Sequence, residues 1–126
     1  MQAFLLVGLG GAIGAMARFG AGKLIGQVWP TNFPLATLLI NIAGSTLMGL
    51  LMGLLARFTP AWSETARLFA AVGVLGGFTT FSSFSLETVQ LIERGEIFWA
   101  GGYVLLSVVV CLAGLYLGLL VTRGFS

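Results

Sequence analysis

The sequence predicts an all-α membrane protein in which one domain, residues 1–126, crosses a bilayer four times. Of its residues, 58% are hydrophobic and only 8% are charged, which leaves too little polar surface to cover a water-soluble globule. The hydrophobic residues also fall in long blocks, and a helix of about 20 such residues crosses a bilayer core of about 30 Å. Four blocks have that length: 3–25, 34–56, 68–92 and 97–121.

The rest of the composition excludes several classes of function. The six Lys and Arg residues are scattered singly, whereas a nucleic-acid-binding protein carries a clustered basic face, so no nucleic-acid partner is expected. The chain has no His and a single Cys, which removes the usual zinc and copper sites. No nucleophile–base pair or phosphate loop is visible, so we do not expect an enzyme. A scaffold or enzyme subunit that transports nothing remains an open alternative.

The first block, 3–25, is rich in glycine and contains an arginine. Gly10 and Gly14 form a pair of small residues four apart, which favours close contact with another helix. Arg18 lies well inside the block, where an arginine is costly unless it is paired, hydrated or able to reach the interface. Arg18 therefore either extends out of the bilayer or contributes to a positive vestibule that attracts anions.

The second block carries a stripe of polar and small residues at four-residue steps, which places them on one helical face. Its members are Thr37, Asn41, Ser45, Gly49 and Gly53. An amide as deep in the block as Asn41 faces lipid only at a cost in free energy. The stripe therefore either packs against another helix or presents the Asn41 NH2 group to a passing anion.

The third block, 68–92, is not typical of one straight helix. Its first part, 68–78, is about 16 Å long at 1.5 Å per residue, which is half of a membrane. The run 76–85 (GGFTTFSSFS) then places two glycines and five hydroxyl groups at mid-depth. Because hydroxyls can satisfy backbone groups that a break frees, we expect the third helix to be broken at mid-membrane beside a wet cavity. A kinked helix whose hydroxyls bond their own carbonyls is the alternative.

Two aromatic residues and one acid follow in the same block. Phe81 and Phe84 stand three residues apart, so both project from one helical face. The positive edges of their rings could assist a partly dehydrated anion, and filling the space between helices is the alternative. Glu87, the only acid within a block, either faces the same crevice as Thr80 and Ser83 or accepts a hydrogen bond from a Thr or Tyr.

The fourth block repeats the four-residue step with Tyr103, Ser107 and Cys111. These side chains share one face, which suits either a polar track or ordinary helix packing.

Charges at the two ends of the spans are nearly balanced. With the N-terminus inside, the cytoplasmic end would hold Arg57, Arg67 and Arg123. The outside would hold Lys23 and Arg94, and also Arg18 if it is counted despite its place inside the block, so the balance is three against two or three. The positive-inside rule then gives almost no preference, which predicts dual topology, with one fixed orientation as the alternative. A bundle of four helices also packs solid, so a pore requires a partner, and an inverted copy of the same chain can supply it.

The run 76–87 (GGFTTFSSFSLE) resembles the third-helix motif of the Fluc family of microbial fluoride channels. The glycine-rich first span ending in 14–19 (GAMARF) and the spacing from Pro34 through Thr37 to Asn41 are similar too. The resemblance covers nearly the whole chain. Cys111 departs from it, standing where a hydroxyl is expected.

The resemblance implies a fluoride-selective channel for passive export, which lowers cytoplasmic fluoride, in the plasma (inner) membrane of a microbe. It implies an antiparallel, dual-topology homodimer surrounded by lipid, with two fluoride pores lined by Phe81 and Phe84. The implied polar residues of the path are Asn41, Thr80, Ser83, Tyr103 and Ser107, and we add Arg18 and Glu87 as candidates.

The resemblance also implies a structural sodium ion at the dimer centre. Backbone carbonyls of Gly76 and Thr79 would hold it, in keeping with the preference of hard cations for oxygen ligands. A small proton-coupled exporter of the multidrug type, also with four spans, is the alternative function. Such a carrier needs an acid deep in its first span, where this chain has Arg18 and no acid.

Overall fold

The computed structural model describes residues 1–29 and 33–123, and this part of the chain contains helices and no strand. The elements are α1 (Gln2–Val28), α2 (Leu35–Phe58), α3 (Ser63–Ala66), the π-helical η1 (Arg67–Leu75), α4 (Gly76–Phe78), α5 (Phe81–Glu93) and α6 (Ile97–Arg123). Within the described residues, four helical segments are long and apolar enough to cross a membrane, the third of them running from α3 through α5. The prediction of an all-α, multi-pass membrane protein is therefore confirmed.

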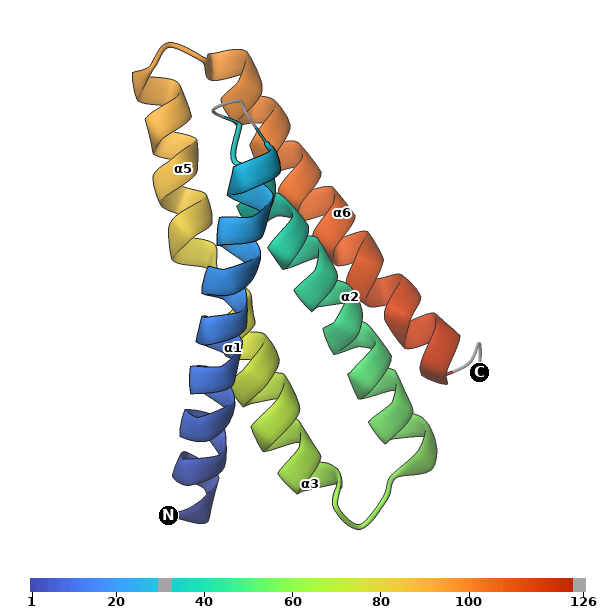
Figure 1. Cartoon of the computed structure of the whole chain (residues 1–126). Coiled ribbons are helices and arrows are strands. Elements are labelled where there is room, and N and C mark those ends of the chain that lie inside the picture. Colours follow the sequence, from blue (N-terminus) through green and yellow to red (C-terminus); the bar gives the residue numbers. More distant parts are fainter. Residues whose placement is uncertain (30–32, 124–126) are drawn as a thin grey trace.

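The four crossings alternate in direction and associate as two pairs (Figure 1). The N-terminus and the loop between α2 and α3 lie at the lower end of the view, and the turn between α5 and α6 lies at the upper end. α2 packs along α6, whereas α1 packs along η1 and α4. The two pairs diverge toward the lower end, and α5 lies beside the upper part of α6.

Glycines allow the helices of each pair to approach closely. Gly10 and Gly14 of α1 are buried, and a Cβ on either would collide with the backbone of η1. Gly49 of α2 faces the carbonyl of Leu115 in α6 in the same way. The close contact predicted for the glycine pair of the first span is thus present, and the lower part of the stripe on α2 serves helix packing.

The interior of the single chain is small. A buried cluster of Leu38, Leu91, Ala100 and Tyr103 joins α2, α5 and α6. Many large apolar side chains instead point outward, as with Phe4 of α1 (81% exposed) and Phe98 of α6 (96% exposed). Such a surface suits contact with lipid chains or with another membrane protein rather than with water.

The third crossing begins earlier than the block 68–92 indicated. Its helix starts at Ser63, and Glu64 accepts a bidentate pair of hydrogen bonds from Arg67, with the shorter N–O distance 2.7 Å. An acid in the first turn favours a helix start through the helix dipole, and its pair with an arginine three residues later stabilises the turn. Polar residues at this end therefore extend the helix beyond the apolar block that hydropathy alone defines.

Candidate functional site: an interrupted helix between two cavities

The third crossing changes backbone conformation at two residues. α4 ends at Phe78, and Thr79 (φ −80°, ψ 156°) and Thr80 (φ −150°, ψ 122°) are extended before α5 begins at Phe81. The N–H and the hydroxyl of Thr79 both still donate to the carbonyl of Leu75, each at 3.0 Å. Beyond this point the helical hydrogen-bond ladder stops, and the freed backbone groups need other partners.

Asn41 of α2 bridges to the backbone of Thr80. Its Nδ2 donates to the Thr80 carbonyl at 3.0 Å, and the Thr80 N–H donates to Asn41 Oδ1 at 2.8 Å. An amide side chain offers a donor and an acceptor side by side, so it can pair with an extended residue as a neighbouring strand would. One of the two hydrogens on Nδ2 remains for another acceptor.

Thr80 also begins α5. Its Oγ1 accepts a hydrogen bond from the N–H of Ser83 at 3.2 Å, which is the usual N-cap arrangement for a threonine. One residue thus ends the interruption with its backbone and starts the next helix with its side chain.

These bonds redirect two donors from the helical ladder. In a continuous α-helix the N–H groups of Thr80 and Ser83 would donate to the carbonyls of Gly76 and Thr79. Here the first donates to Asn41 and the second to the Thr80 hydroxyl. The carbonyl oxygens of Gly76 and Thr79 therefore lose their α-helical donors, which fits them for a cation that prefers oxygen ligands.

Arg18 reaches the interruption from α1. Its Nε donates to the carbonyl of Gly77 at 3.2 Å, so this side chain extends toward the interrupted helix. Gly77 in turn packs closely on α1, because a Cβ at this position would lie 2.6 Å from the carbonyl oxygen of Gly11. Glycine is thus required where the arginine contacts the backbone.

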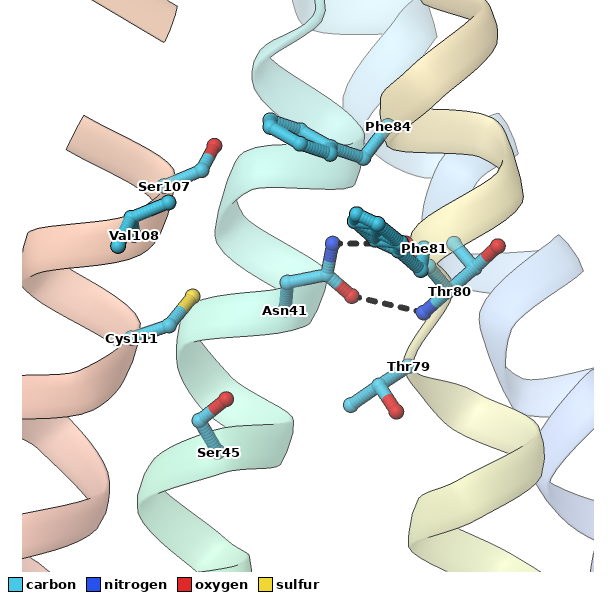
Figure 2. A pocket seen from close by; sticks show the side chains of 9 residues that line it. All are labelled: Asn41, Ser45, Thr79, Thr80, Phe81, Phe84, Ser107, Val108 and Cys111. Atoms are coloured by element: carbon cyan, nitrogen blue, oxygen red, sulfur yellow. Dashed lines mark hydrogen bonds between the residues drawn. The ribbon is translucent and has the colours of Figure 1, made fainter. Parts of the chain in front are cut away.

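A cavity of about 260 Å³, here called the Asn41 cavity, lies between the interruption and the facing sides of α2 and α6 (Figure 2). It is lined by Asn41, Ser45, Thr79, Thr80, Phe81, Phe84, Ser107, Val108 and Cys111. All of these lining residues are uncharged. The hydroxyl oxygen of Ser107 is buried without a hydrogen-bond partner among the described residues.

A second cavity of about 330 Å³, here called the Arg18 cavity, lies on the α1 side. It is lined by Arg18, Phe19, Gly22, Lys23, Ala36, Thr37, Ile40, Thr80, Ser83 and Glu87. Two cations and one carboxylate therefore face this space. Thr80 lines both cavities, so the interruption is where they adjoin.

The two phenylalanines of α5 form part of a ladder of aromatic rings. Phe81 and Phe84 stack with centroids 5.4 Å apart, and Phe84 lies 5.1 Å from Tyr103. Tyr103 is fully buried, whereas Phe81 is 70% exposed. Phe81 therefore does not fill the interior of the single chain, unlike Tyr103 at the other end of the ladder.

Glu87 satisfies both interpretations that the sequence left open. It lines the Arg18 cavity together with Thr80 and Ser83, and it accepts a hydrogen bond from the Tyr103 hydroxyl at 3.2 Å. That bond links the cavity to the aromatic ladder.

The structure divides the predicted site residues between the two cavities. The Asn41 cavity is lined by Asn41, Thr79, Thr80, Phe81, Phe84 and Ser107, and the Arg18 cavity by Arg18, Thr80, Ser83 and Glu87. Gly76 lines neither of the two. Tyr103 lines neither and connects them through Glu87 and Phe84. Lys23 and Ser45 were not among the predicted site residues. The four-residue step from Asn41 pointed to Ser45, and the proximity of Lys23 to Arg18 in sequence was the available signal for Lys23.

Comparison with known proteins identifies close relatives over the full length. Residues 5–119 match the family described as CrcB-like protein, Camphor Resistance (CrcB). A protein of Hyphomonas neptunium named fluoride-specific ion channel FluC is 50% identical over 98% of this chain and 97% of its own length. Proteins of the same name from Novosphingobium aromaticivorans and Paracoccus denitrificans are 51% and 53% identical, covering 100% and 96% of this chain and 100% and 94% of their own lengths.

These matches extend over all four crossings and both cavities. The chain therefore belongs to the CrcB-like family.

Proposed function

We propose that this chain forms a fluoride-selective channel, which lets fluoride leave the cytoplasm passively across the plasma (inner) membrane of a microbe. The observation that carries the proposal is the position of Thr80, which borders a cationic cavity on one side and an uncharged cavity with a few hydroxyl and amide groups on the other. The names of the relatives support a channel over a proton-coupled exporter. The described first span, moreover, contains no acid.

Each cavity suits a different part of the passage. The two positive charges of Arg18 and Lys23 outnumber the single negative charge of Glu87 in the lining of the Arg18 cavity. The cavity therefore raises the local concentration of anions. In the Asn41 cavity, the second amide hydrogen of Asn41 and the hydroxyl of Ser107 can replace hydrating water. Contacts with such neutral donors and with aromatic edges are individually weak, which lets an ion leave as well as enter.

The functional unit is proposed to be an antiparallel homodimer with the interruption at mid-membrane. The exposure of Phe81 supports this assembly, because a partner would cover a ring that the single chain leaves 70% exposed. The balance of basic residues between the two ends supports insertion in both orientations. In such a dimer, the Asn41 cavity of each copy would be completed by the other.

A sodium ion is proposed as the structural cofactor of that dimer. The carbonyl oxygens of Gly76 and Thr79 would hold it, since their α-helical donors are engaged elsewhere. Within the described residues no cluster of His, Cys, Asp or Glu offers a metal site, and a backbone site suits a hard monovalent cation. The ion would supply positive charge that fixes two interrupted helices against each other.

The proposal is tested by efflux from liposomes that contain the purified protein. Loaded with fluoride or chloride, the liposomes are made permeable to the counter-cation, and external anion is followed with ion-selective electrodes. We expect rapid loss of fluoride and loss of chloride close to that of protein-free liposomes. Equal rates for the two anions would contradict the proposed selectivity for fluoride. Release of neither anion would contradict the proposal that the chain forms a channel.

A further inference from the structure

Cys111 is the one cysteine of the chain and lines the Asn41 cavity. The proposed passage of fluoride assigns no role to its thiol. Cys111 lies on α6 one turn after Ser107, so both side chains project from the same helical face. Both line the cavity, and the thiol is free and only partly buried. The sulfur is therefore at the surface of a space large enough to admit a small molecule.

The hydroxyl of Ser107, one turn before Cys111, lacks a hydrogen-bond partner within the described part of the chain, and a small ligand in the cavity could supply one. Ser107 is 7% exposed, and its oxygen has no hydrogen-bond partner among the described residues. Leaving a buried hydroxyl without a hydrogen-bond partner destabilises the folded protein. A partner that enters the cavity removes that destabilisation, and Cys111 adjoins the space where the partner would lie.

A third polar side chain faces the thiol from the other helix. Ser45 of α2 and Cys111 of α6 line the same cavity, and Figure 2 shows the sulfur of Cys111 on the side of α6 that faces α2. The thiol therefore points across the cavity toward α2 and away from the lipid-facing side of α6. A group attached to the sulfur would project between the two helices that border the proposed path.

We propose that Cys111 is a modification site within the path, at which a small, uncharged, thiol-directed electrophile attaches and stops conduction. This inference rests on the proposed function. An uncharged reagent is specified because every lining residue of the Asn41 cavity is uncharged, so a cation entering it would lose hydration without gaining a counter-charge.

A thiosulfonate ester is the simplest reagent of this class. The thiol gives its proton to solvent, and the thiolate attacks the sulfenyl sulfur of the reagent. A disulfide bond forms, the bond between the two reagent sulfurs breaks, and a sulfinate leaves with the electron pair. A reducing thiol reverses the modification by exchange.

The experiment measures fluoride efflux from liposomes before and after treatment with methyl methanethiosulfonate. We expect the treated protein to fall to the leak rate of protein-free liposomes and to recover after dithiothreitol. The Cys111→Ser variant should show the same rate treated as untreated, whatever its starting rate. Intact mass spectrometry of the same samples reports whether one methylthio group has been added.

A control cysteine on the exposed side of α6 distinguishes modification within the path from modification of the outer surface of the helix. Leu112 is the next residue and is 66% exposed, so Leu112→Cys in the Cys111→Ser background should accept the methylthio group without loss of flux. Modification of Cys111 with unchanged flux would overturn the inference, as would failure of Cys111 to react in the folded protein. An untreated protein that moves no fluoride would instead contradict the proposed function, and its mass would still report whether the reagent reaches Cys111.

Discussion

Thr80 brings three roles together at one position. Its backbone pairs with Asn41, its hydroxyl caps α5 through Ser83, and its side chain borders both cavities. The capping hydroxyl also releases the carbonyl of Thr79 from the helical ladder. Because Asn41 provides both the donor and the acceptor for the Thr80 backbone, the geometry of the interruption depends on this amide.

We predict that Asn41→Leu lowers the stability of the folded protein by about 2 kcal/mol, from two hydrogen bonds at about 1 kcal/mol each. Leucine has a similar volume, but it leaves the N–H and carbonyl of Thr80 unpaired. The measurement is thermal unfolding in detergent, with Leu39→Ala as the control on the same helix, since Leu39 is 42% exposed. Equal midpoints for Asn41→Leu and the unaltered protein would contradict the role given to the amide.

The aromatic ring of Phe81 is predicted to act on the moving ion. Phe81→Ile keeps an apolar side chain but removes the positive ring edge, and we expect the initial rate of fluoride efflux to fall about tenfold, or about 1.4 kcal/mol in the barrier. Leu86→Ile is the control, because Leu86 lies on the same helix and is 59% exposed. A loss of rate equal in the two variants would leave the ring without a specific role.

At the scale of elements, the packing of α1 determines where Arg18 lies. Gly14 meets the backbone of η1, and Arg18 follows one turn later, where its Nε donates to the Gly77 carbonyl. Gly77 contacts Gly11 in the same interface. Close approach of two helices thus brings a charged side chain to the interrupted backbone, and the distance between helices sets the geometry of the contact.

Gly14→Ala tests this coupling. A Cβ at Gly14 would collide with the carbonyl of Val74, whereas a Cβ at Gly8 on the same helix meets nothing within 4 Å. We expect Gly14→Ala to lower the unfolding free energy by about 1–3 kcal/mol and to slow fluoride efflux. Gly8→Ala should be neutral or stabilising, since alanine favours a helix over glycine. The same thermal and efflux measurements apply, and equal behaviour of the two variants would exclude close packing as the determinant.

The sequence predicted the number and order of the crossings because apolar length alone defines a crossing. It also indicated where α4 gives way to α5, since Gly76, Gly77 and the hydroxyls that follow disfavour a continuous helix. It did not indicate the π-helical turns of η1, for which the local residues carry no signal. The pairing of Asn41 with Thr80 was not predicted either, because it joins residues 39 apart in sequence.

At the scale of the whole molecule, the account requires a second copy. Lys23 and Arg94 are near one end of the crossings, and Arg57, Arg67 and Arg123 are near the other. A difference of one basic residue gives insertion little electrostatic preference. The two cavities adjoin at Thr80, but Phe81 remains open on the outside of the single chain. An inverted partner would cover this ring and provide the second wall of the path.

We predict that both orientations coexist in the membrane. Ala61→Cys in the Cys111→Ser background places one thiol in the exposed loop between α2 and α3. A membrane-impermeant maleimide added to intact cells should label roughly half of the molecules, and disrupted cells should show complete labelling. Labelling of all or of none in intact cells would establish a single orientation and contradict the antiparallel dimer.

An experimental density map of the protein in lipid tests the central claim most directly. The account predicts that α4 and α5 are separated at Thr79–Thr80 near the bilayer centre, facing an inverted second copy, with solvent or anion density on both sides of Thr80. A continuous α-helix through these two threonines, with both hydroxyls bonded to carbonyls of the preceding turn and lipid packed against them, would contradict it.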